Sequence, residues 1–485
     1  MRYRRLLPIL VLCGMSAGAR AAPATARGAH DIEQTYAAYL GHAVIDEGIV
    51  SVAPDGDSYV VTWNLQKAVE LAAPPPGELD IGALTYRLTP GPGGAWTLKG
   101  EHFPKIAFEG RADKGQASGA LDLGGFHVEG VYDPALSEFL RSTTSVETLQ
   151  GAFQIEDSGQ RSEFSLSEDG LTLEARVKPS AEGNGVDVAL AQAFKAMRES
   201  ISTPSPDEGG DPEQMTYALT SVVGGASFEG LRAREIGEVW TYLVAHADDS
   251  ATPPELKTRI QSALPLWRDI DAHAQIHDLQ FNMPQGSATL KTLAETLRLT
   301  GFTAKGSVQF GLEVEDMAVK SDLAPPWLDA FWPASVSLNL SGSSDGWDEA
   351  ARIALQDPHF GDKGDLSPRT QDEIAATLAA GHPKLTIAPS HVKTPALDMT
   401  FEGEASAEAG AAAGHFKVTA DSLDKTIALL VEIGRTEPDA QNAVLGVTFL
   451  KGLARTGDDG RLVWEVDVAG GGEVTVNGTP MPVGR

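Results

Sequence analysis

The sequence of 485 residues contains a single cysteine, Cys13. This residue lies in an N-terminal segment with the pattern of a signal peptide, so we expect the mature chain to contain no cysteine. Such a chain can form no disulfide and offers no thiol nucleophile. We therefore expect it to be stabilised by its own apolar core, which a chain of this length can form.

Basic residues are scarce. The chain has 38 Lys and Arg against 67 Asp and Glu, which gives a formal net charge of −29. Removal of the N-terminal segment would take away four arginines and no acidic residue, and would change the net charge from −29 to −33. A protein with this charge repels nucleic acid and anionic headgroups at long range, so we expect no nucleic-acid partner. A local basic patch remains compatible with the composition.

Long apolar runs are also missing at the N-terminus. Three arginines among the first five residues precede the apolar run Leu6–Leu12, and Ala19–Ala21 has the A-x-A form of a cleavage site. The whole apolar stretch is shorter than the roughly 17 residues that span a bilayer, and it contains Pro8. We therefore predict a Sec-type signal peptide over residues 1–21, cleavage after Ala21, no transmembrane segment in the mature chain and a periplasmic location.

Catalytic motifs are absent as well. The sequence has no G-x-S-x-G, no P-loop and no G-x-G-x-x-G pattern, and its acidic residues are too numerous to single out a glycosidase pair. Ser422 and Lys425 fit the S-x-x-K pattern of acyl-transfer enzymes, but its companion motifs are missing. The pair Asp421-Ser422 is explained by the start of a helix. We therefore predict a non-enzyme with no cofactor and no catalytic, cofactor-binding or metal-binding residue.

One group of residues has the composition of a metal site. His273 and His277 lie beside Asp269, Asp271 and Asp278, and the two histidines would share one face of a helix. Apolar residues alternate with the polar ones, however, which is typical of a strand with a polar outer face. The strand is the favoured interpretation.

An aromatic cluster offers a second candidate. Trp327, Phe331 and Trp332 lie among three prolines and could form a docking surface for apolar or sugar ligands. The alternative, which we favour, is a loop that covers the core of a sheet.

Alternating apolar and polar residues dominate the rest of the chain and predict strands. A hairpin is the clearest early example, with strands 49–52 and 59–63 around a turn at 54–57. Further strands are expected at 82–88, 95–100, 106–111, 119–123, 126–132, 149–155, 161–167, 171–177, 273–282, 286–299, 306–314, 335–341, 384–388, 396–404, 414–419, 460–468 and 473–477. Their close and regular spacing favours antiparallel connections.

Short helices are expected between the strands, most of them starting at or near Asp or Ser. They are predicted at 31–40, 133–141, 187–200, 347–355 and 421–433, and a mid-chain helical hairpin at 231–247 and 253–267. The repeated order of two strands and a capped helix suggests degenerate duplication without a fixed period.

The predicted fold class is therefore α+β, predominantly antiparallel β, with two β-rich halves of long twisted sheets. The expected organisation is a signal peptide (1–21), an N-terminal β-rich half (22–201), a linker or exposed loop (202–213), a helical segment (214–270) and a C-terminal β-rich half (271–485). The Pro, Gly, Ser and acidic content of segment 202–213 predicts a linker or exposed loop there.

Several turn and strand signatures resemble a known family. They are the segments 265–267, 283–286, 324–327 and 331–333 with the strand 336–340, and the ending 458–478. These resemble secreted alphaproteobacterial proteins that share a domain of unknown function, and the ending is also similar to that of YdgA-type periplasmic proteins. The architecture has a more distant likeness to AsmA-type envelope proteins, whose long sheets hold lipid. The resemblance supplies no site residues.

Three functions are compatible with these features. The favoured one is a non-catalytic periplasmic protein that binds lipid or another apolar envelope component in a groove of its sheets. The alternative is a structural or protein-interaction module with periplasmic protein partners, whose apolar faces are fully covered. An envelope hydrolase is the third, and it requires His, Asp or Ser side chains that converge in one cleft.

Overall fold

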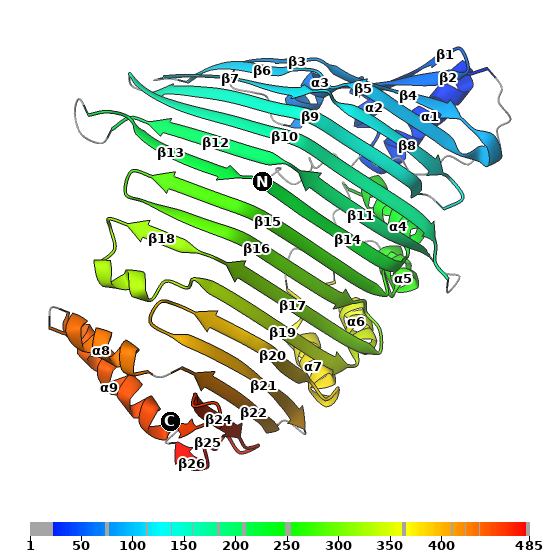
Figure 1. Cartoon of the computed structure of the whole chain (residues 1–485). Helices are drawn as coiled ribbons and strands as arrows, with labels where there is room; N and C mark the ends of the chain where they lie inside the picture. Colours follow the sequence, from blue (N-terminus) through cyan, green and yellow to red (C-terminus); the bar gives the residue numbers. More distant parts are fainter. Residues whose placement is uncertain are drawn as a thin grey trace. The chain divides into compact units, whose positions relative to one another are not determined.

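The computed structural model describes residues 23–72, 77–112, 115–136, 138–157, 159–181, 185–205, 210–247, 254–360, 365–408, 411–421, 423–435 and 437–481. The chain is divided into two compact units, of which the first ends at Arg268 and the second starts at Asp269. Antiparallel strands make up most of both, which confirms the predicted β-rich α+β class (Figure 1). The predicted signal peptide lies outside the described residues. Within the described ranges, no helix is long and apolar enough to cross a membrane.

The strands of the first unit are β1 (Val50–Asp55), β2 (Ser58–Asn64), β3 (Gly77–Ile81), β4 (Ala83–Pro90), β5 (Trp96–His102), β6 (Ile106–Ala112), β7 (Gly115–Gly124), β8 (His127–Asp133), β9 (Glu138–Asp157), β10 (Gln160–Pro179), β11 (Val186–Phe194), β12 (Ala196–Thr203), β13 (Glu213–Leu219) and β14 (Ser221–Leu231). Its helices are α1 (Ala26–Leu40), α2 (Ala43–Asp46), α3 (Leu65–Ala72), α4 (Ala233–Ala245), α5 (Pro254–Ala263) and the 3₁₀ turn η1 (Pro92–Gly94).

Two long strands, β9 and β10, form the centre of the first unit and pair along almost their whole length. The far side of β10 pairs first with β12 and then, beyond Gly170, with β11. Gly170 has a φ of +65°, a conformation that favours glycine, and it does not interrupt the strand. The prediction of two separate strands at 161–167 and 171–177 was therefore wrong, because the change of pattern at Gly170 is a local irregularity inside one strand.

The core of the first unit lies between α1 and the strands beneath it. Ile32 and Tyr36 of α1 are buried against β1, β2, β4 and β5. The hydroxyl groups of Tyr36 and Tyr86 are hydrogen-bonded to each other, and the Trp63 indole Nε1 donates to the Tyr86 hydroxyl at 3.2 Å. This hydrogen bonding satisfies polar groups that would otherwise be buried without a partner.

Two predicted helices are strands in the structure. Residues 133–141 begin with a turn, in which the Ala135 amide donates to the Asp133 carboxylate at 2.8 Å, and continue as β9. Asp133 therefore stabilises a turn, a role that Asp shares with helix capping. Residues 187–200 form β11 and β12, which have paired strands on both sides. These ladders override the helix propensity of the segment.

The predicted helical segment 214–270 begins differently from the expectation. Strands β13 and β14 occupy residues 213–231, and helices α4 and α5 follow where the helical hairpin was predicted. Thr203 of β12 is opposite Glu213 of β13, so both ends of the predicted linker or exposed loop 202–213 belong to paired strands, and its residues 206–209 lie outside the described residues.

The strands of the second unit are β15 (Asp269–Met283), β16 (Gly286–Thr300), β17 (Lys305–Glu315), β18 (Ala318–Ser321), β19 (Ser335–Asp345), β20 (Lys384–Lys393), β21 (Asp398–Glu408), β22 (Ala411–Ala420), β23 (Arg455–Thr456), β24 (Leu462–Val468), β25 (Val474–Val476) and β26 (Thr479–Met481). Its helices are α6 (Trp347–Gln356), α7 (Pro368–Ala380), α8 (Asp424–Ile433), α9 (Pro438–Leu453) and the 3₁₀ turn η2 (Pro326–Ala330).

The main strands of the second unit form one antiparallel series, β15-β16-β17-β19-β20-β21-β22-β24 (Figure 1). The predicted final hairpin is confirmed, with Val466 opposite Val476. Trp464 of β24 is buried in a core cluster with Ala420 and Leu423, against which α8 and α9 pack. Helices at 347–355 and 421–433 were predicted, whereas α7 and α9 were not.

Candidate apolar ligand site

Two parallel rows of apolar residues cross the second unit on one face of its sheet. Residues directly opposite each other in neighbouring strands share a face, and residues two apart along one strand do as well. The first row consists of Leu299, Val308, Gly342, Leu385, Ala405 and Gly414. The second row consists of Leu297, Phe310, Leu340, Ile387, Gly403 and Phe416. We call these two rows the apolar sheet face.

Part of the apolar sheet face is open to solvent. Leu385 is 47% exposed, Leu297 42% and Phe310 36%, although all three lie on strands with paired neighbours on both sides. Exposed apolar area costs free energy at about 25 cal/mol per Å² relative to burial. Exposed apolar residues on a paired sheet are typical of binding surfaces, which makes this face a candidate site.

The opposite face of the same strands is charged. Lys384 Nζ lies 2.6 Å from a Glu404 carboxylate oxygen, and His415 Nδ1 lies 2.7 Å from an Asp467 oxygen. The hydrogen bond to Asp467 raises the pKa of His415, and the hydrogen bond from Lys384 lowers the pKa of Glu404. The two faces therefore differ sharply in polarity, and the charged one suits contact with water.

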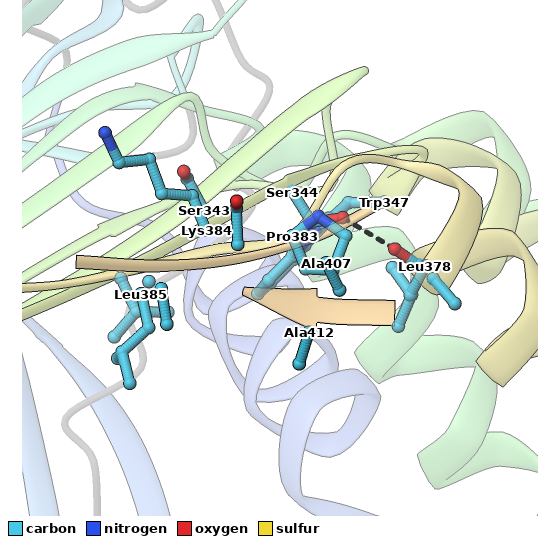
Figure 2. A pocket seen from close by; sticks show the side chains of 14 residues that line it. Ser343, Ser344, Trp347, Leu378, Pro383, Lys384, Leu385, Ala407 and Ala412 are labelled. Carbon is cyan, nitrogen blue, oxygen red and sulfur yellow. Dashed lines mark hydrogen bonds between the residues drawn. The ribbon is translucent and has the colours of Figure 1, made fainter. Parts of the chain in front are cut away.

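A cavity of about 510 Å³ lies along the first row of the apolar sheet face. Its floor includes Val308, Gly342, Leu385 and Ala405, and α6 and α7 provide walls with Trp347 and further residues. Almost all of the surface that lines the cavity is apolar. Figure 2 shows Leu385 directed to the opposite side of the strand from the Lys384 ammonium group. The volume falls in the range of roughly 300–1,000 Å³ that is typical of ligand sites.

Two contacts hold the helical wall against the sheet. The Trp347 ring lies on Gly306 of β17, where a Cβ atom would come within 2.2 Å of the ring. Ser344 Oγ of β19 donates to the Leu378 carbonyl of α7 at 2.9 Å (Figure 2). Glycine at position 306 is therefore needed for the close approach of α6.

A buried carboxylate connects the two helices of this wall. Asp357, 1% exposed, follows α6 and accepts hydrogen bonds from the Ser367 amide at 3.1 Å, the Ser367 hydroxyl at 2.6 Å and the His359 amide at 2.7 Å. These hydrogen bonds, led by that of Ser367, hold the pKa of Asp357 well below its usual range. Ser367 is the N-cap of α7, so the cluster has a structural explanation.

The structure places the five residues of the possible metal site along β15, and the prediction of a strand there is confirmed. Asp269 forms an ion pair with Arg298 of β16 at 3.1 Å. In the part of the chain that the structure describes, no group of three or more His, Cys, Asp or Glu residues is arranged to hold a metal ion.

The S-x-x-K pattern falls partly outside the described residues, because Ser422 is not among them. Lys425 belongs to the first turn of α8, and its Nζ donates to the Pro395 carbonyl at 2.6 Å. This lysine therefore anchors α8 to the segment before β21.

The aromatic cluster lies on and just after η2. The rings of Trp327 and Phe331 meet edge to face, with 6.1 Å between their centroids. The indole Nε1 atoms of Trp327 and Trp332 are buried without a hydrogen-bond partner among the described residues. These side chains are half-buried, which is compatible with both interpretations of the cluster.

No family model, no curated protein and no solved structure matches the chain. The resemblance to secreted proteins with a domain of unknown function, to YdgA-type proteins and to AsmA-type architecture thus stays a prediction.

Proposed function

We propose that this protein is a non-catalytic lipid-binding protein of the periplasm, and that the apolar sheet face holds the acyl chains of an envelope lipid. One observation carries the proposal: the cavity beside Trp347 shares Val308, Gly342, Leu385 and Ala405 with an apolar face that is partly exposed. A ligand in the cavity can therefore extend along the sheet.

The chemistry of the lining favours an acyl chain over a polar ligand. A buried polar group without a hydrogen-bond partner costs roughly 2–7 kcal/mol, and the cavity offers almost no polar atoms. An acyl chain has no polar group to satisfy and requires no hydrogen-bond partner in the cavity. The ion pairs Lys384–Glu404 and His415–Asp467 lie on the other face, where they do not compete for this space.

The periplasmic location depends on the sequence of residues 1–21. Mass spectrometry of the protein from a periplasmic extract tests this part of the proposal. We expect an N-terminus at Ala22. A chain that keeps Met1 and stays in the cytoplasm would contradict it.

The lipid proposal is tested by native mass spectrometry of the full chain expressed with its own N-terminal segment and purified without detergent. We expect bound masses that extraction and fragmentation identify as lipids. Gly342→Phe should abolish them, since a Cβ at Gly342 meets no atom within 4 Å and the added ring would fill the cavity.

Ser341→Phe is the matched control, because Ser341 is the preceding residue of β19 and its side chain lies on the opposite face. We expect this variant to keep its lipid. A wild-type protein that is free of lipid, or a Gly342→Phe variant that retains it, would overturn the proposal.

A further inference from the structure

A row of small residues lies at the foot of the helical wall. Gly306 and Ser344 are opposite each other in β17 and β19, and Ala407 and Ala412 are opposite each other in β21 and β22. Each lies two residues along its strand from a member of the first row, so all four share the apolar sheet face. We call these four residues the small row. Ser344, Ala407 and Ala412 line the cavity, so the cavity extends from the first row to the small row.

Helices α6 and α7 are fixed against the small row. The Trp347 ring of α6 rests on the glycine of this row. At the end of α7, the Asp345 amide donates to the Gly381 carbonyl at 2.8 Å, and a Cβ atom at Gly381 would come within 2.1 Å of the Asp345 carbonyl oxygen. The Leu378 carbonyl accepts the hydrogen bond from Ser344 Oγ (Figure 2). Trp347 and Leu378, which both line the cavity, are therefore held in place at the small row.

The side of the cavity away from the small row leads to open apolar surface. Among the described residues, the lining includes members of the small row and of the first row and none of the second row. The second row follows two residues further along the strands, and its Leu297 and Phe310 are 42% and 36% exposed. An apolar chain in the cavity thus meets the helices at one end and exposed apolar side chains at the other.

The polarity of the cavity determines which end of a lipid it can hold. Its lining surface is almost entirely apolar, so a headgroup there would lack hydrogen-bond partners. The end that suits the cavity is the terminal methyl group of an alkyl chain. We propose that Trp347 and Leu378 form an end stop for this chain, so that the helical wall selects the length of the chain that the protein binds. This inference rests on the proposed function and adds a determinant of its specificity.

The end stop has a measurable consequence for affinity. Each methylene that moves from water onto the apolar sheet face should tighten binding roughly fourfold. The gain ends when the chain fills the distance from the wall to the edge of the apolar sheet face, because further carbons then remain in water. We call the chain length at which the affinity stops rising the limiting length.

Competition binding tests the inference. Saturated fatty acids from octanoate to eicosanoate displace a fluorescent fatty-acid analogue from the delipidated full chain, and their affinities give the limiting length. Trp347→Ala removes the stop, so its limiting length should increase, with a gain of roughly fourfold for each methylene beyond the wild-type limit. Ala407→Leu adds a larger side chain to the small row inside the cavity, so its limiting length should decrease.

Leu385→Ala is the matched control, because Leu385 lies on the floor of the cavity in the first row and is 47% exposed. It should weaken the binding of every fatty acid that covers the first row and leave the limiting length unchanged. Circular dichroism checks that each variant folds. If Trp347→Ala does not fold, Trp347→Phe replaces it, since a smaller ring should shift the limiting length in the same direction.

A limiting length that is equal in the wild type, the Trp347 variant and Ala407→Leu would overturn the inference and leave the lipid proposal intact. A wild-type affinity that rises through the whole series without a limit would do the same. Absence of wild-type binding at every chain length would overturn the lipid proposal, and this inference with it.

Discussion

The Trp347 ring rests directly on the backbone of Gly306, and this contact closes the helical wall of the cavity against β17. A methyl group at position 306 would meet the ring at 2.2 Å, so Gly306→Ala has to displace the indole. We expect a loss of about 1–3 kcal/mol in the free energy of unfolding, which is typical of overpacking. Urea denaturation with tryptophan fluorescence measures it.

Gly342→Ala is the control for this prediction. Gly342 lies on the same face, but a Cβ there meets nothing within 4 Å. We expect its stability to equal or slightly exceed that of the wild type, because alanine restricts the unfolded chain more than glycine does. An equal loss of unfolding free energy in Gly306→Ala and Gly342→Ala would show that the contact between Trp347 and Gly306 does not limit stability.

A second prediction concerns the core of the first unit. Tyr86→Phe removes the hydroxyl that joins Tyr36 and Trp63, and leaves the buried Tyr36 hydroxyl and the half-buried Trp63 indole without this partner. We expect a loss of roughly 1–3 kcal/mol in the free energy of unfolding. Tyr217→Phe, on a half-buried tyrosine of β13, should cost less. An equal loss in the two variants would contradict the importance of the hydrogen bonds.

Alkaline pH tests the buried pair of Tyr36 and Tyr86 in another way. Burial raises the pKa of Tyr86 to about 12, and it raises the pKa of Tyr36 well above its ordinary value. A raised folded-state pKa means that stability is fully present below pH 10 and is lost as the pH rises towards 12. We expect the Tyr86→Phe variant to lose less stability across this interval. Urea denaturation of the wild type and of Tyr86→Phe at each pH measures the two free energies of unfolding.

Much of the fold was predictable because alternation is visible in the sequence. The β1–β2 hairpin and the final hairpin followed from local pattern and turn residues alone. The segment 187–200 was not predictable in this way, since its helix-forming residues become strands only through pairing with β10 on one side and with β14 and β13 on the other. The start of helix α7 is visible in the sequence, because Ser367 is a typical N-cap residue and Pro368 is favoured at the first helical position.

The cavity could not be predicted from the sequence. Val308, Gly342, Leu385 and Ala405 are distant in the chain and become neighbours only through the strand register. Two of them are small residues with no distinctive local pattern. Cavities form where side chains are small and neighbours do not fill the space, which depends on tertiary packing.

A third prediction uses the ion pair on the charged face. Asp467 is the main cause of the raised pKa of His415, so Asp467→Asn should lower that pKa towards the ordinary value of 6.5. Because the folded-state pKa is raised, the pair stabilises the protein fully below pH 6.5, and this stability is lost as the pH rises through the folded-state pKa. Titration of the His415 ring resonances by NMR in both proteins checks the shift. An unchanged pKa would exclude the interaction.

The last prediction concerns the buried carboxylate of Asp357. Its lowered pKa means that its contribution to stability is present above the ordinary value of 3.8 and is lost as the pH falls towards the folded-state pKa. Asp357→Asn should be less stable than the wild type at pH 7, because its amide cannot accept all the hydrogen bonds from Ser367 and His359. Its stability should also fall less between pH 5 and roughly 3 than that of the wild type.

Asp348→Asn, on an exposed ion pair with Arg352, is the control and should change stability by at most about 1 kcal/mol. If Asp357→Asn and the wild type lose stability in parallel on acidification, the carboxylate does not hold α6 and α7 together through its charge.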